Sequence, residues 1–270
     1  MPKNNEGFHE TIVIFVKAPE PGLVKTRLAR SPYITESDAA KIAEGMLRDT
    51  IILSANSGID SICVGFFPSD KEDYFRAIID SLRDLINKSI NFHLFPQSGN
   101  DFDERFESIV KKVLNYGFDQ MVILGADLPY MDPKLIILAF SELSAKDCVR
   151  KIVIGPAREG GIYLVGITED FDPEWFTKYN LFRGGIELSQ FGMLCKENNI
   201  DIALLPPLTD IDIEEDLVSM ISFIEVMSYS SNLAHYHFPY FTSHVLKKLK
   251  LSVEQLPGET RKRYLKRGNN

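Results

Sequence analysis

The chain has 270 residues, of which 44% are hydrophobic and 25% are charged, and its formal net charge is −8. This size fits one large α/β domain, alone or with an appendage, and the acidic balance argues against nucleic-acid binding over the whole surface. No apolar run approaches the roughly 20 residues that cross a bilayer, and the N-terminus lacks the apolar core of a signal peptide. Three widely spaced cysteines, Cys63, Cys148 and Cys195, favour reduced thiols over disulfides or a zinc site, so we expect a cytoplasmic protein.

Short runs rich in valine and isoleucine alternate with longer segments of helical period. The runs are almost continuously apolar, as are strands buried on both faces, and the alternation predicts a mainly parallel sheet. The strand that follows the Gly160-Gly161 turn is expected to be antiparallel or offset. The predicted strands are residues 11–16, 61–66, 91–95, 120–125, 151–155, 161–167 and 201–207, and the main predicted helices are 37–56, 70–86, 103–117, 132–146 and 214–227.

Two parts of the chain are expected: a nucleotide-binding unit at residues 10–227 and a C-terminal extension at 228–270. Residues 241–270 contain eight Lys or Arg and two Glu, a net charge of +6. We expect this extension to be helical and partly disordered. Its charge is compatible with contacts to RNA, to membrane phosphates or to the protein's own acidic face, and also with a solvated helix and a frayed terminus.

Ligands of an open parallel α/β sheet bind beyond the carboxyl ends of its strands. Four such segments combine cations, carboxylates and glycines, which together suit a metal-bound phosphate ligand. These segments are KAPEPGLVKTR, DLPYMD, PAREGG and LTDIDIEED.

Asp127 follows a predicted strand, and Asp210 and Asp212 alternate with isoleucines in an extended segment. Asp127 with either of the other two could hold Mg²⁺, which takes one or two carboxylates and leaves its other positions to water and phosphate. Ordinary turn and helix-capping chemistry explains each aspartate equally well when it is considered alone.

Lys17, Lys25 and Arg27 lie in and after a loop shaped by proline and glycine. Pro19 and Val24 replace the glycines of a Walker-type phosphate loop, so the amide nest of that loop is not expected here. Phosphates could instead be bound by the side-chain charges and a helix N-terminus, and the alternative is a solvated cationic loop.

Two further segments are weaker candidates. Gly160 and Gly161 allow a positive φ or a close backbone approach after Glu159, although a hairpin turn needs no other explanation. Gln97 and Gly99 follow the third predicted strand, where polar groups could meet the edge of a base.

Four elements in order, VKAPEPGLVKTRL, GADLPYM, GPAREGGIYLVGI and DIDIEEDL, resemble the DUF2064 family of the nucleotide-diphospho-sugar transferase (GT-A) superfamily. The first element is also distantly similar to 2-phospholactate guanylyltransferase and to molybdenum-cofactor guanylyltransferases. The resemblance covers about residues 10–225 and implies a three-layer α/β/α sandwich with a mainly parallel sheet.

The resemblance also implies roles for single residues. The nucleotide's phosphates and base map to Lys17, Gly22, Lys25, Gln97 and Gly99, with Lys17, Lys25, Arg27 and Asp127 as the catalytic set. The metal, Mg²⁺ or Mn²⁺, maps to Asp127 and Asp212, and the acceptor to Glu159, Gly160 and Gly161. The family usually has aspartate at 159, tyrosine at 162 and a tryptophan-bearing segment near 183–187, where this chain has Glu159, Ile162 and RGGIE.

The sequence therefore predicts a transferase, with three readings open. The first is Mg²⁺-dependent nucleotidyl transfer from a nucleoside triphosphate to a small anionic acceptor, with release of pyrophosphate. The second is glycosyl transfer from a nucleotide sugar, and the third is nucleotide binding without catalysis. The single aspartate of GADLP weighs against the second reading, because no D-x-D follows that strand.

Overall fold

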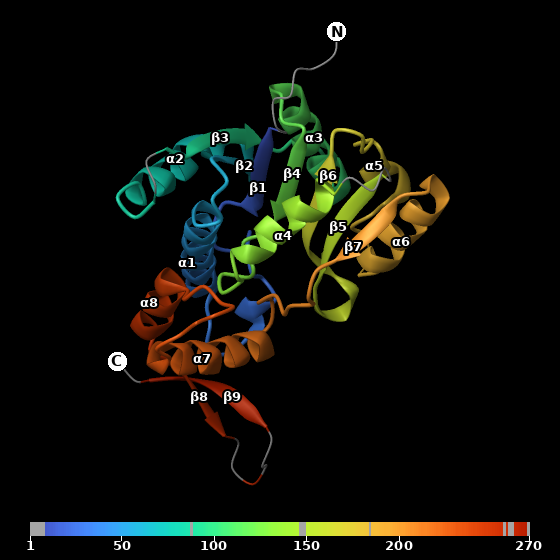
Figure 1. Ribbon diagram of the computed structural model, residues 1–270. Coiled ribbons are helices and arrows are strands. Elements are labelled where there is room, and N and C mark those ends of the chain that lie inside the picture. Colours follow the sequence, from blue (N-terminus) through green and yellow to red (C-terminus); the bar gives the residue numbers. More distant parts are fainter. Residues whose placement is uncertain are drawn as a thin grey trace.

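The computed structural model describes residues 9–86, 89–145, 150–183, 185–255, 258 and 262–268. Seven strands form one sheet in the order β3-β2-β1-β4-β6-β5-β7 (Figure 1). Every neighbouring pair is parallel except those of β6, which is antiparallel to β4 and to β5. The strands are β1 (Glu10–Lys17), β2 (Ser61–Phe67), β3 (Asn91–Pro96), β4 (Gln120–Leu124), β5 (Lys151–Pro156), β6 (Ile162–Thr168) and β7 (Asp201–Leu204).

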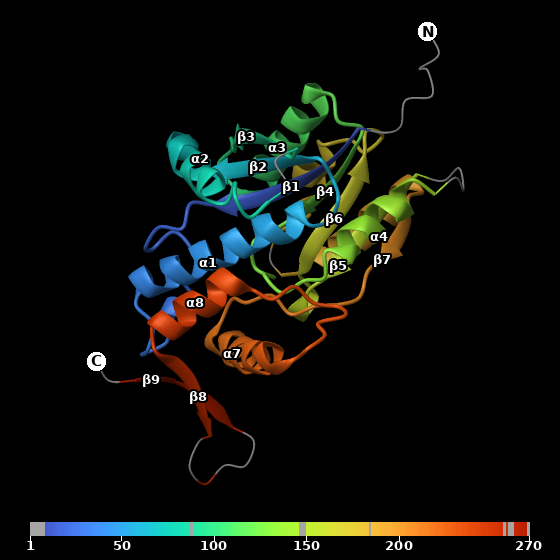
Figure 2. The ribbon, with the colours of Figure 1, turned by 60° about the vertical axis from the view of Figure 1, so that its left-hand side comes forward.

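Helices cover both faces of the sheet (Figures 1 and 2). Strand β1 shows why its sequence is apolar throughout: Ile12 and Ile14 join one hydrophobic core and Val13 joins the other, all fully buried. One face carries α1 (Glu36–Ala55), α2 (Glu72–Ser81), α4 (Lys134–Leu143), α7 (Glu214–Tyr229) and α8 (Tyr240–Lys248), and the other carries α3 (Phe102–Tyr116), α5 (Trp175–Tyr179) and α6 (Glu187–Asn198). The predicted three-layer α/β/α architecture with a mainly parallel sheet is confirmed.

Local capping chemistry sets the ends of the helices beside the site. Thr35 precedes α1, and its hydroxyl accepts a hydrogen bond from the Asp38 amide at 3.1 Å. Asp101 plays the same part for α3, accepting from the Glu104 amide at 2.9 Å, and Gly117 ends that helix in the left-handed conformation.

Among its described residues, the C-terminal extension is helical over the last residues of α7 and over α8. It continues as a two-stranded antiparallel hairpin of β8 (Leu251–Gln255) and β9 (Arg263–Arg267), which projects beyond α7 (Figures 1 and 2). The expectation of a helical extension is wrong there, because the two segments pair with each other as antiparallel strands. The expected disorder at 256–257, 259–261 and 269–270 lies outside the described residues.

Helix α8 is attached to α1 through a buried carboxylate. Asp49 accepts hydrogen bonds from the Phe241 amide at 2.9 Å and from the amide and hydroxyl of Thr242, each at 2.7 Å. Gly45 allows this approach, since a Cβ there would lie 3.1 Å from the Cα of Thr242. The first helix and the extension are thus held together by both packing and hydrogen bonds.

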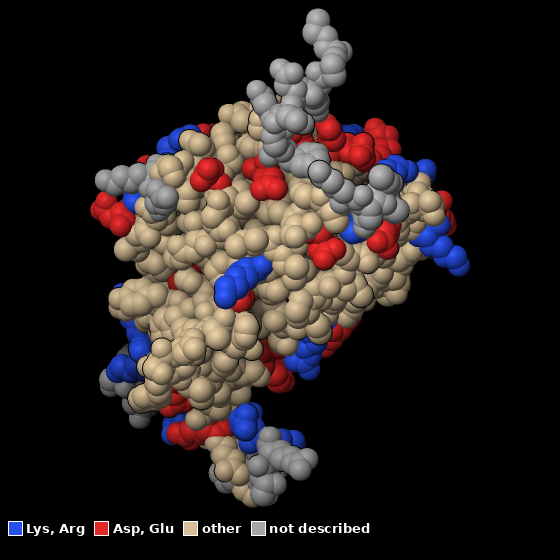
Figure 3. All heavy atoms as spheres, in the orientation of Figure 1, with Lys and Arg blue, Asp and Glu red and all other residues tan. Residues whose placement is uncertain are grey.

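Two basic residues of the hairpin are paired within the molecule. Arg267 donates to the Asp38 carboxylate at 2.7 Å, and Lys266 lies 2.6 Å from Glu254. Figure 3 shows cations and carboxylates side by side at the hairpin. Of the contacts expected for the extension, the structure contains the one to the protein's own acidic groups.

Two remaining sequence features concern thiols and membrane spans. Cys63 and Cys195 are free and buried, and Cys148 lies outside the described residues. Among the described helices, none has the length and apolar character needed to cross a membrane.

Candidate active site

One cavity of about 280 Å³ unites the cationic loop with two of the predicted carboxylates. It lies beyond the carboxyl ends of β1 and β4, which are parallel neighbours, so the loops that follow them lie at one edge of the sheet. The segment after β7 reaches the same edge. The sequence-predicted residues that line this cavity are Lys17, Lys25, Arg27, Asp127 and Asp212.

Lys25 joins three segments that are far apart in the chain. Its Nζ lies 2.7 Å from Oδ1 of Asp127 and also donates to the carbonyl of Ile211, while the amide of Ile211 donates to the Asp127 carbonyl at 3.1 Å. The Lys25 side chain is only 7% exposed, whereas that of Asp127 is 49% exposed. Lys25 also has a φ of 49°, a backbone conformation that non-glycine residues rarely adopt outside constrained sites.

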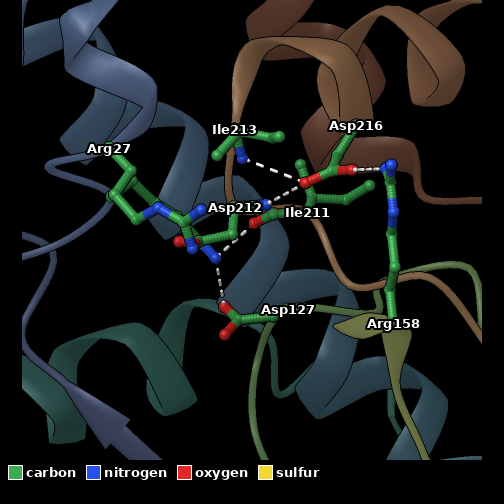
Figure 4. A network of polar contacts seen from close by, with 8 residues as sticks. Arg27, Asp127, Arg158, Ile211, Asp212, Ile213 and Asp216 are labelled. Atoms are coloured by element: carbon green, nitrogen blue, oxygen red, sulfur yellow. Dashed lines mark hydrogen bonds and ion pairs between the residues drawn. The ribbon is translucent and has the colours of Figure 1, made fainter. Parts of the chain in front are cut away.

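Asp216, in the first turn of α7, holds the second carboxylate segment in place (Figure 4). Its Oδ2 accepts hydrogen bonds from the amides of Asp212 and Ile213 at 3.1 and 3.0 Å, and its Oδ1 accepts from Arg158 at 3.1 Å. The Asp212 carboxylate is then free to meet Arg27, whose Nη1 lies 2.6 Å away. Arg27 is therefore paired with Asp212, and Arg158 is paired with Asp216.

Lys17 lines the cavity, and Arg105, which does not line it, lies near enough for its charge to act on Lys17. Burial lowers the pKa of Lys17, and the nearby charge of Arg105 lowers it further. Within the described part of the chain neither side chain has an ion pair, and the buried Nε of Arg105 has no hydrogen-bond partner. Arg105 rests on the ring of Phe67, with its guanidinium 5.1 Å from the ring centre. Two unpaired, mutually repelling cations favour an anion between them.

Sequence analysis did not assign a role to Arg105 or Arg158. Arg105 lies in the first two turns of α3, directly after the loop that follows β3, and Arg158 lies within the PAREGG segment. Position at the ligand-binding edge of the sheet was therefore the signal that could have found both residues.

Gln97 and Gly99 occupy structural positions in the loop after β3, and neither lines the cavity. The side-chain amide of buried Gln97 donates to the carbonyls of Val16 and Gly65 at 3.0 and 2.8 Å, which ties the ends of β1 and β2 together. Gly99 has a φ of +138°, and a Cβ there would lie 2.5 Å from the Cβ of Glu104. A contact of either residue with a base stays a prediction.

The glycines of the other loops differ in conformation. Gly22 lies in the exposed turn of the cationic loop at a φ of +77° and does not line the cavity. In the turn between β5 and β6, positive φ values occur at Glu159 (58°) and Gly160 (+87°), whereas Gly161 is extended. Glu159 and Gly161 line an adjoining cavity of about 210 Å³, together with Arg27, Arg158, Glu187, Asp210, Asp212 and Asp216.

The metal site was expected at Asp127 and Asp212. Both carboxylates are partly exposed in the same cavity, and oxygen donors of this kind suit Mg²⁺, although Lys25 and Arg27 hold one oxygen of each. Asp210 lines a neighbouring cavity together with Asp127, and burial raises the pKa of Asp210, to which the charge of Asp127 adds and which the charge of Lys25 opposes. The described residues contain no group of three or more His, Cys, Asp or Glu arranged to hold a metal ion.

Two solved structures that are similar to this chain carry enzyme names. The "putative nucleotide-diphospho-sugar transferase" from Desulfovibrio desulfuricans G20 is 25% identical with a TM-score of 0.70, over 90% of this chain and 95% of that chain. The 4-diphosphocytidyl-2C-methyl-D-erythritol synthase from Anaerococcus prevotii DSM 20548 is 12% identical with a TM-score of 0.50, over 80% and 97%. The second likeness shows the fold alone.

Sequence comparisons give one match. No curated protein matches the chain. The family model described as "Uncharacterized protein conserved in bacteria (DUF2064)" matches residues 61–183. Together with the fold shared with the Desulfovibrio desulfuricans protein, this match over residues 61–183 confirms the resemblance to DUF2064.

Proposed function

We propose that the protein is a Mg²⁺-dependent nucleotidyltransferase that uses a nucleoside triphosphate. The observation that carries this proposal is the single cavity in which three cations of the first loop meet Asp127 and Asp212. Cations suit the phosphates, and partly exposed carboxylates suit the metal that nucleoside triphosphates carry. Attack of an acceptor on the α-phosphorus needs both the cations and the metal at one place.

In this proposal, phosphate binding, metal binding and charge neutralisation are assigned to different residues of the site. Lys17 and Arg105, which have no ion pair with a described residue, bind the phosphates, and Asp127 and Asp212 hold Mg²⁺ or Mn²⁺. Lys25 orients Asp127 and neutralises developing charge with Arg27. An acceptor oxygen or nitrogen attacks the α-phosphorus and gives up its proton, where it carries one, to solvent water. The bond from that phosphorus to the bridging oxygen breaks, and pyrophosphate leaves with the electron pair.

Glycosyl transfer from a nucleotide-diphospho-sugar is the second candidate. It is favoured by the 25% identity to the Desulfovibrio desulfuricans protein, which extends over 90% of this chain. The two reactions share the metal and phosphate groups but break different bonds. Nucleotidyl transfer cleaves the α–β phosphate linkage, whereas glycosyl transfer cleaves the bond from the sugar to the β-phosphate.

Binding and turnover of defined nucleotides separate the candidates. We expect the purified full-length chain to bind one of the four nucleoside triphosphates in a Mg²⁺-dependent manner, measured by calorimetry, and to release pyrophosphate when a metabolite extract is added. Asp127→Asn should abolish the Mg²⁺ dependence. Asp170→Asn, which makes the same change at an exposed site outside the cavity, should leave it intact.

Other outcomes contradict the proposal in distinct ways. Turnover of a UDP- or GDP-sugar without release of pyrophosphate from a triphosphate assigns glycosyl transfer. Binding without turnover of either class, with Asp127→Asn equal to the unmodified protein, assigns nucleotide binding without catalysis.

A further inference from the structure

The groove continues past Asp127 into a second cavity of about 420 Å³ over the ends of β4 and β6. Phe15, Phe102 and Asp127 line this cavity as well as the first one, so the two are continuous. In the nucleotidyl-transfer reaction proposed above, the acceptor approaches from the side away from the phosphate-binding cations. The second cavity lies on that side.

Aromatic rings form one wall of the second cavity. Phe102 and Phe182 have ring centres 5.0 Å apart, and Phe106 and Phe182 lie at 4.6 Å, so the rings make one continuous cluster with Phe15. Rings fixed by such packing present a rigid apolar surface at low cost in side-chain entropy. This wall suits an acceptor with a flat apolar face.

The ionisable groups that line the second cavity are acidic. Asp127, Glu187 and Asp210 contribute carboxylates, and no Lys or Arg of the described chain lines this space. Arg27 and Arg158 line the adjoining cavity, but Arg27 is already ion-paired with Asp212 and Arg158 with Asp216.

Two of the carboxylates that line the second cavity, Glu187 and Asp210, form no ion pair with a described residue, although the charge of Lys25 acts on Asp210. Glu159, in the adjoining cavity, also forms no ion pair with a described residue. The first cavity is lined by the unpaired cation Lys17, with Arg105 close enough to act on its charge. The groove is therefore polarised along its length, with unpaired positive charge at the phosphate end and unpaired negative charge beyond Asp127.

We propose that the acceptor carries no phosphate or carboxylate and instead offers amino or hydroxyl hydrogens to the carboxylates, with an apolar ring face against the phenylalanines. An anionic acceptor would have to lose its hydration to enter a space lined by three carboxylates, Asp127, Glu187 and Asp210, of which only Asp127 is ion-paired, and by no Lys or Arg of the described chain. This costs both desolvation and repulsion. An amine or alcohol has donors that match these acceptors. The anionic acceptor expected from the sequence has no free cationic partner among the described residues here.

Glu187 is the residue that decides this selectivity. It is the first residue of α6 and lines both the second cavity and the adjoining one. Unlike Asp127, it belongs to neither the cationic loop nor the proposed metal pair. Changing its charge therefore tests acceptor recognition separately from nucleotide binding.

Three probes with one ring and different end groups test the proposal on the nucleotide-free full-length protein. We expect phenethylamine and 2-phenylethanol to bind at least about tenfold more tightly than phenylacetate, measured by ligand-observed NMR titration. Tighter binding of the amine assigns a cationic acceptor, and equal binding of amine and alcohol assigns a hydroxyl acceptor. Glu187→Lys should raise the affinity for phenylacetate to that for 2-phenylethanol. The phenylacetate affinity of Glu187→Gln should lie between those of the unmodified protein and of Glu187→Lys.

Glu197→Lys is the matched control, because it makes the same charge change on an exposed residue of the same helix, away from these cavities. Equal binding of phenylacetate and the other two probes overturns the proposal, as does an equal effect of Glu187→Lys and Glu197→Lys. Failure of all three probes to bind overturns the aromatic recognition. Since no nucleotide is present, these results stand apart from the triphosphate-binding experiment that tests the proposed function.

Discussion

The Nζ atom of Lys25 lies 2.7 Å from Oδ1 of Asp127, and this contact links the cationic loop to the loop after β4. The same Nζ donates to the carbonyl of Ile211, so one side chain fixes three segments of the candidate site. Lys25 thus has a structural part in the site in addition to the charge that it contributes.

Replacing Lys25 should weaken both the fold and the site. Lys25→Met leaves the Asp127 carboxylate and the Ile211 carbonyl without their shared donor, so we expect the free energy of unfolding to fall by about 1–3 kcal/mol. Lys41→Met removes an exposed lysine 3.5 Å from Asp38 and should cost at most about 1 kcal/mol. Urea unfolding of both variants measures the difference, and equal losses would contradict the linking role.

Removing Asp216 should lower nucleotide affinity although it lies behind the site. Asp216→Ala frees the amides of Asp212 and Ile213 and the guanidinium of Arg158. We expect the Mg²⁺-nucleotide complex to bind about tenfold less tightly, because the Asp212 segment is no longer held. Glu215→Ala, at the exposed neighbouring position, should leave the affinity unchanged in the same titration. Affinities that are equal in the two variants would exclude this positioning role.

Gly99 should tolerate a methyl group less well than another glycine of positive φ. Gly58 has a φ of +87°, and a Cβ added there would meet no atom within 4 Å, so Gly58→Ala should cost about 1 kcal/mol from backbone strain alone. Gly99→Ala adds the contact with Glu104 and should cost about 1–3 kcal/mol more. Thermal unfolding of the two variants gives the comparison, and similar losses would mean that the loop shifts freely.

Asp49 should make the attachment of α8 depend on pH. Burial raises the pKa of Asp49 to about 6 in the folded protein, although its hydrogen bonds from Thr242 and Phe241 oppose the rise. The folded state then binds a proton that the unfolded state has released, so stability should fall as pH rises from about 4 to about 6 and stay level above. The change is at most roughly 3 kcal/mol.

Asp49→Asn isolates this effect, because the variant keeps the other carboxylates of the chain. Subtracting its unfolding free energy from that of the unmodified protein, at each pH between 4 and 7, should give a curve that declines with pH. A flat difference curve would show that Asp49 titrates in the folded protein as it does in the unfolded chain.

The order of strands and helices could be predicted because it depends on local patterns. Apolar runs such as residues 11–16 are buried on both faces, and capping residues such as Thr35 and Asp101 set where helices begin by accepting hydrogen bonds from their first amides. The parallel alternation then places the candidate loops at one edge, and the residues predicted there line one cavity, while their roles stay predictions: Lys17, Lys25, Arg27, Asp127 and Asp212. The hairpin β8–β9 was missed because its two short strands are stable only against each other and the body of the protein.

The sequence by itself determined the α/β architecture and which residues gather at the binding edge, since periodicity and turn chemistry act over a few residues. Only the tertiary structure decided which charges are neutralised. Lys25 pairs with Asp127 and Arg27 with Asp212, whereas among the described residues Lys17 and Arg105 stay unpaired at one end and Glu187 at the other. The physical reason is that an ion pair depends on distances of a few ångströms between distant segments, which no local pattern encodes.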